Sequence, residues 1–98
     1  MRRGILSILV LGVVLAVVGS VLAQQWQYVG VVTSDVSRDE TSLLVDATQP
    51  IQAGKLILIE SRDGLVRETY EVRHVYGHVV ILEVPLKTAF VSGAKLFQ

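Results

Sequence analysis

Hydrophobic and polar residues are distributed differently in the first 23 residues and in the rest of the chain. Residues 4–23 contain no charged side chain, whereas after Gln24 short hydrophobic stretches alternate with polar segments rich in Gly, Pro, Asp and Ser. Short apolar runs between turn residues are typical of β-strands, and no stretch after Gln24 shows a helical period. The pattern predicts that residues 24–98 form an all-β domain.

Six strands are expected, at residues 25–33, 41–47, 55–61, 65–75, 78–84 and 94–97. Arg62-Asp63-Gly64 predicts a hairpin turn, because Asp and Gly tolerate the backbone angles that such turns need. Tyr76-Gly77 predicts a second turn, and residues 56–59 are all apolar, so both faces of that strand should be covered. Six short strands in one small domain favour a barrel.

Hydrophobic and polar residues alternate along the strand at 65–75, and this alternation assigns its side chains to two faces. The solvated face should carry Arg67, Thr69, Glu71 and Arg73, and the buried face Val66, Tyr70, Val72 and His74. With the turn centred on Tyr76-Gly77, His74 pairs with Val79 and Val75 with His78, so the two histidines point to opposite faces. We therefore expect His74 to be half-buried, His78 to be exposed and no metal site to use both.

The chain also contains two segments with a similar order of residue types, which we call the internal echo. "SLLVDATQPIQAGKLIL" and "VVILEVPLKTAFVSGAKLF" both run through a strand, an acidic residue, a loop with Pro, a Gly, a Lys-Leu pair and a second strand. The echo predicts two similar halves related by a pseudo-twofold axis, an arrangement that closes a barrel and hides its strand edges. The alternative is that any two strand-loop-strand units share this pattern.

The N-terminal segment has the layout of a secretory signal peptide. Arg2 and Arg3 precede an apolar core at residues 5–18, Gly19-Ser20 follows, and Val21-Leu22-Ala23 offers a cleavage site. Cleavage after Ala23 would define a signal peptide at 1–23 and an exported barrel domain at 24–98. The alternative is that this one hydrophobic helix stays as a membrane anchor, since residues 4–23 are long enough to cross a bilayer. Both interpretations place the domain outside the cytoplasm, as a secreted or a single-pass anchored protein.

The amino-acid composition limits which partners the domain can bind and how the folded domain can be stabilised. The formal net charge is zero, and without Arg2 and Arg3 seven basic side chains stand against nine acidic ones. No basic run follows the leader, which argues against nucleic-acid binding. The chain has no cysteine, so a domain this small has no disulfides to support it, and self-association is an expected source of stability.

The sequence holds no signature of catalysis or of a cofactor. It lacks a nucleophile elbow, a phosphate-binding loop, HExxH and Cys-x-x-Cys. Asp35, Asp39 and Glu40 are a weak candidate for calcium, although their spacing matches no dedicated calcium loop. We therefore expect a protein that is not an enzyme, carries no cofactor and has no metal site beyond that weak candidate.

Glu68 is an acidic residue on the buried face of its strand. It could be a buried acid paired with Arg, a catalytic group, or an exposed residue that a bulge turns outward. No second titratable partner for it is evident from the neighbouring sequence on that face. We favour a structural role, because ordinary ion pairs also hold such acids.

Aromatic and apolar residues near the two ends of the domain are candidates for interactions. Trp26 and Tyr28 lie in the first strand, and Leu96 and Phe97 in the last. They could pack in the core, or the two terminal strands could pair with each other or with a neighbouring copy. Pairing between copies predicts self-association.

Residues 42–97 resemble a small β-module that recurs in phage virion proteins and in secreted or surface proteins of prokaryotes. The elements that carry the resemblance are "IQAGKLILI", "RETYEVRHVYGHVVILEVPL" and "FVSGAKL". The resemblance implies a non-catalytic structural or assembly protein of a cell surface, filament or virion-like structure, acting through contacts with itself or another surface protein. The alternatives are a glycan- or protein-binding module of the envelope and, if residues 4–23 remain, a membrane-tethered accessory domain.

Overall fold

The computed structural model describes residues 25–98, and the predicted signal peptide or anchor at 1–23 lies outside them. The strands are β1 (Tyr28–Val32), β2 (Ser42–Ala47), β3 (Leu56–Glu60), β4 (Arg67–Tyr76), β5 (Val79–Leu82) and β6 (Lys95–Phe97). The described part of the chain is all-β, as predicted, and it holds no helix of the length and hydrophobicity that a membrane crossing requires.

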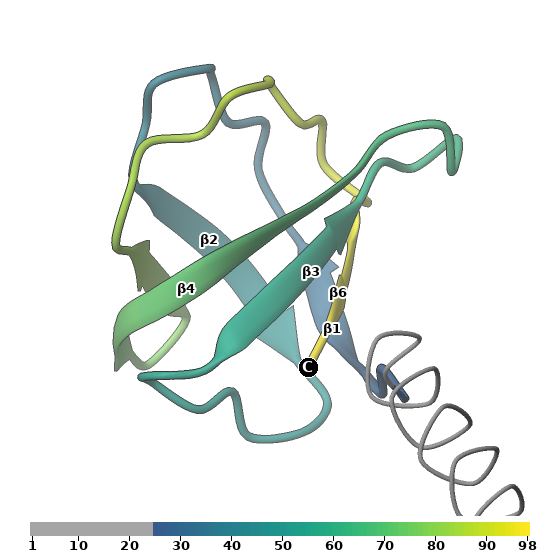
Figure 1. Cartoon of the computed structure of the whole chain (residues 1–98). Helices are drawn as coiled ribbons and strands as arrows, with labels where there is room; N and C mark the ends of the chain where they lie inside the picture. Colours follow the sequence, from purple (N-terminus) through teal and green to yellow (C-terminus); the bar gives the residue numbers. More distant parts are fainter. Residues whose placement is uncertain (1–24) are drawn as a thin grey trace, which may run out of the picture.

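The six strands form one closed barrel in the order β1-β2-β5-β4-β3-β6 (Figure 1). Every neighbouring pair is antiparallel, including β1 and β6, which close the barrel. The predicted barrel is therefore confirmed, and the first and last strands pair with each other. Closure gives both strands two partners and removes the free edges that could otherwise add a strand from another molecule.

The strand order has the symmetry that the internal echo predicts. Exchanging β1 with β4, β2 with β5, and β3 with β6 reproduces the same six neighbour pairs. The 48–55 loop then corresponds to the 83–94 loop in the strand order, although the matched leucines differ, because Leu56 is exposed and Leu96 is buried.

Two register shifts alter the simple alternation. One lies in β1 between Tyr28 and Gly30, and the other in β4 between Val72 and His74. A bulge inserts an extra residue and reverses the faces of the side chains beyond it. As a result Val75 packs against the core and His74 is exposed, so the prediction of a half-buried His74 is wrong.

The turn between β4 and β5 is one residue later than predicted. Tyr76 pairs with Val79, Val75 with Val80 and His74 with Ile81, which leaves Gly77 and His78 as a two-residue loop. Gly77 has a φ of 57°, which its lack of a side chain allows. His78 is exposed in this loop, as expected.

The core fills the barrel and is closed by loop residues at both ends. We call one end the entry end, formed by residues 25–27, the 48–55 loop, the 77–78 turn and Gln98; Ile51 closes it. The other is the lid end, formed by the 33–41, 61–66 and 83–94 loops. There Val36, Leu86 and Phe90 are buried, and Val36 and Phe90 pair through two backbone hydrogen bonds of 2.8 and 3.0 Å.

Candidate functional site

The hairpin loop between β3 and β4 projects from the lid end and is held by its own polar groups (Figure 1). The Ser61 hydroxyl donates to Asp63 Oδ1 at 2.6 Å, and the Leu65 N–H donates to the same oxygen at 3.0 Å. The Val66 N–H donates to Ser61 Oγ at 2.9 Å. The bonds that Asp63 accepts, that from Ser61 above all and then that from the Leu65 N–H, lower the pKa of its carboxyl group, so the carboxylate holds the turn at neutral pH.

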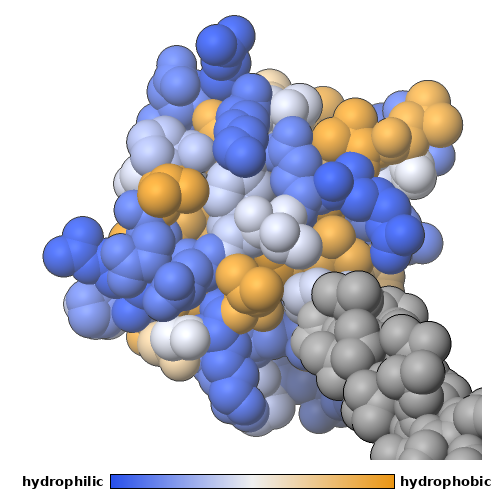
Figure 2. Space-filling view, viewed as in Figure 1, coloured by the Kyte–Doolittle hydropathy of each residue, from blue (hydrophilic) through white to orange (hydrophobic). Residues whose placement is uncertain are grey.

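This rigid loop carries the most exposed large hydrophobic side chain of residues 25–98. Leu65 is 83% exposed, and Val91, on the adjacent 83–94 loop, is 47% exposed. Val66, Ala89 and Val91 line a shallow groove between the two loops. We call Leu65, Val66, Ala89 and Val91 the hairpin patch; Figure 2 shows hydrophobic surface gathered on the projecting hairpin.

Beside the hairpin, Glu68 joins β4 to the 83–94 loop. Glu68 pairs with the core residue Ile59, so it faces inward, and it is half-buried. Its Oε1 accepts a hydrogen bond from the Tyr70 hydroxyl at 2.5 Å and its Oε2 accepts one from the Thr88 hydroxyl at 2.7 Å. The Tyr70 oxygen in turn accepts the Lys87 N–H at 2.8 Å.

Tyr70 is thus the titratable partner of Glu68 that the sequence argument overlooked. Two effects raise the pKa of Tyr70 above its ordinary value of 10.0: burial of the phenol, which is the larger, and its hydrogen bond to Glu68. The phenol therefore stays protonated and keeps donating to the carboxylate. The geometry fastens Lys87 and Thr88 to the barrel and so fixes the loop that carries Val91.

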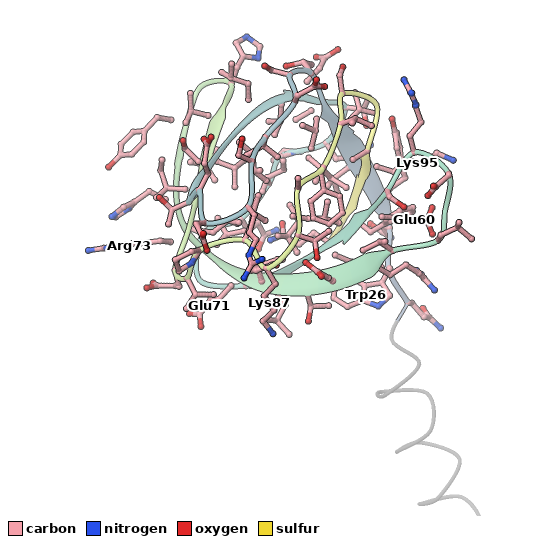
Figure 3. All side chains as sticks on the ribbon, turned by 90° about the horizontal axis from the view of Figure 1, so that it is seen from above. Trp26, Glu60, Glu71, Arg73, Lys87 and Lys95 are labelled. Carbon is pink, nitrogen blue, oxygen red and sulfur yellow. The ribbon has the colours of Figure 1, made fainter. Side chains whose placement is uncertain are left out.

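The four residues proposed for interactions occupy different environments. Leu96 is fully buried and belongs to the core cluster, which is the core-packing alternative given for it above. Tyr28 is 44% exposed and meets the half-buried Phe97 edge to face, with ring centroids 5.9 Å apart. Trp26 is half-buried, and Figure 3 shows it outside the barrel wall. Strand alternation places the adjacent Leu96 and Phe97 on opposite faces, but it does not say which of the two faces the core.

The weak calcium candidate is not assembled in the described residues. Asp35, Asp39 and Glu40 are exposed at the lid end, and the Asp35 carboxylate accepts the Ser92 N–H at 2.8 Å. Across residues 25–98 no three His, Cys, Asp or Glu side chains are grouped to hold a metal ion.

The hairpin patch is the feature that sequence reasoning missed. The available signal was Leu65 itself, an apolar residue directly after the Asp-Gly turn, where polar residues are usual. A scan against protein-family models and searches of curated proteins and of solved structures each found no match to the chain. The resemblance to virion and surface modules therefore stays a prediction.

Proposed function

We propose that this chain is a non-catalytic, exported structural protein that assembles through protein–protein contacts, with the hairpin patch as its contact surface. The observation that carries the proposal is Leu65, held 83% exposed at the tip of a loop fixed by three side-chain hydrogen bonds. The export and the assembly role rest on the leader and on the resemblance described above. A cell surface, a filament and a virion-like structure are the settings that fit.

The rigidity of the hairpin is what makes an exposed Leu useful for binding. An apolar side chain gains free energy when a partner removes it from water. Binding costs less when the loop is already ordered, because less conformational entropy is lost. Ser61 and Asp63 order one side of the patch, and the Glu68–Thr88 bond orders the other.

Replacing Leu65 by serine tests the proposal. We expect the wild-type domain, residues 24–98, to self-associate with rising concentration in sedimentation velocity, and the L65S variant to associate about tenfold more weakly, as for an interface anchor. Its free energy of unfolding should change by no more than about 0.5 kcal/mol, because Leu65 packs against little in the free protein.

Leu44→Ser is the matched control. Leu44 is also an exposed leucine, at 49%, but it lies on β2, away from the hairpin. It should leave the association unchanged. A wild-type domain that remains monomeric at high concentration, or equal effects of the two substitutions, would contradict assembly through the hairpin patch.

The membrane-tethered accessory domain is a second candidate, favoured by a separate observation. The exposed apolar residues Tyr28 and Leu56 lie on the barrel wall near the entry end, where the chain arrives from the hydrophobic segment 4–23. The glycan-binding alternative has less support, because Tyr28 has its ring against Phe97 and Trp26 is half-buried rather than openly displayed.

A further inference from the structure

The two ends of the barrel differ in charge. The loops of the lid end carry most of the acidic side chains in residues 25–98, namely Asp35, Asp39, Glu40, Asp63 and Glu83. Residues 25–27, 48–55, 77–78 and 98, which form the entry end, include no Asp or Glu. Five of them are glutamines, and Lys55 supplies a positive charge. The entry end can therefore approach phosphate groups without repulsion between like charges.

The glutamines are part of an ordered surface. The Gln98 side chain accepts the Gln52 N–H at 2.7 Å and donates its own N–H to the Gln52 carbonyl at 2.8 Å. The Gln98 N–H also donates to the Gln27 carbonyl at 2.9 Å, which ties the start of β1 to the end of β6. These bonds order the Gln98 side chain and the backbone of Gln27 and Gln52, so the entry end presents a fixed polar face.

The outer wall formed by β1, β6 and β3 also differs between the two ends: it is apolar near the entry end and charged near the lid end. Near the entry end, Tyr28 pairs with Phe97 and Phe97 with Leu58, and Leu56 lies two residues before Leu58. Leu58 belongs to this outer wall yet is only 5% exposed, so its neighbours cover it, whereas Leu56 is 51% exposed. We call Tyr28, Leu56, Leu58 and Phe97 the apolar wall.

Toward the lid end this wall is charged on β3 and β6, and the neighbouring β4 carries the exposed charged residues Arg67, Glu71 and Arg73 along its length. Lys95 pairs with Glu60, and Glu60 forms an ion pair with Arg67 at 3.2 Å. Figure 3 shows Glu60 and Lys95 outside the barrel, away from the labelled Glu71 and Arg73. Glu71, which pairs with Leu56, marks the border of the apolar wall. The apolar half of the wall is thus the half next to the start of β1.

The sequence before β1 indicates what lies beside that half. Residues 4–23 form a stretch of 20 residues without a charge, about the length that spans a bilayer as a helix. Trp26 and Tyr28 follow within five residues. Trp and Tyr collect at the boundary between the acyl chains and the headgroups, where an amphipathic ring meets both environments.

We propose that the entry end and the apolar wall rest on the headgroup region of the lipid bilayer that residues 4–23 enter, so that the lid end and its hairpin patch point away from the membrane. The inference rests on the second candidate function, in which residues 4–23 are retained. The apolar wall supplies hydrophobic contact, Lys55 attracts lipid phosphate, and the glutamines donate hydrogen bonds to the headgroups.

The test uses the full chain reconstituted in vesicles of phosphatidylcholine and phosphatidylglycerol. Trp26 is the only tryptophan, so Trp26→Phe gives a background in which one new tryptophan reports on one place. The reporter is Leu56→Trp. Leu44→Trp, at a position of nearly equal exposure on β2, and Leu65→Trp, in the hairpin patch, are the controls. Far-UV circular dichroism verifies that each variant is folded.

We expect brominated lipids to quench the Leu56→Trp emission at least about twofold more than the emission of either control, with iodide quenching in the opposite order. Equal quenching at the three positions would overturn the inference. If Trp26 in the parent chain is still quenched by brominated lipid in that case, the tether holds and only the lipid contact of the wall fails. A chain that washes off the vesicles overturns both.

Discussion

Replacing Phe90 by alanine is expected to remove about 3–5 kcal/mol from the free energy of unfolding. The Phe90 ring is 2% exposed and, with Val36 and Leu86, closes the lid end of the core. A domain of this size has a total stability of about 4–11 kcal/mol, at roughly 0.05–0.15 kcal/mol per residue. The loss is therefore at least about a quarter of the total stability, and urea denaturation followed by circular dichroism should show a correspondingly lower midpoint.

Val91→Ala is the control for this prediction. Val91 is the next residue along the chain, but it is 47% exposed, so its loss should change the stability by no more than about 0.5 kcal/mol. If Phe90→Ala cost no more than Val91→Ala, the 83–94 loop would not be the lid of the core, and the support for the hairpin patch would be lost with it.

Gly30→Ala is the second substitution with a large expected effect. A Cβ atom at Gly30 would clash with the Asp46 carbonyl oxygen and would lie 2.9 Å from the Ala47 Cα atom. Both contacts are with the backbone of β2, so no side chain can move aside to relieve them. Separating β1 from β2 would strain the closed barrel, and we expect a loss of about 3 kcal/mol or more in urea denaturation.

Gly64→Ala separates steric conflict from conformational cost. Gly64 has a φ of 79°, but a Cβ there would meet no atom within 4 Å. The alanine should cost only about 1–2 kcal/mol, from the left-handed backbone alone. A Gly30 variant as stable as the Gly64 variant would show that β1 and β2 are not as closely apposed as the structure has them.

The strands and most turns could be predicted because their signals are local. Each predicted strand overlaps an observed one, and the Asp63-Gly64 hairpin lies where its turn chemistry placed it. The alternation in the first part of β4 assigned Tyr70 and Val72 to the core correctly. Closure of the barrel also followed, since six short strands with an internal echo have few other ways to hide their edges.

What the sequence could not supply depends on contacts between distant segments. The bulge after Val72 exposes His74, and no residue type near Val72 predicts a bulge there. Leu96 and Phe97 could be assigned to the core and the outer wall only when their partners Ile59 and Leu58 were known. One partner of Glu68 could not be predicted locally, because Thr88 lies 20 residues further along the chain, on the 83–94 loop.

Both proposed functions require that the barrel is exported, and one measurement tests this location directly. The chain has no cysteine, so Leu44→Cys creates a single reactive thiol at an exposed position outside both proposed contact surfaces. A membrane-impermeant maleimide applied to intact cells, or to spheroplasts where an outer membrane intervenes, and to the surrounding medium should label this cysteine without lysis. A cysteine that becomes labelled only after the cells are lysed would place the barrel in the cytoplasm and contradict both proposed functions.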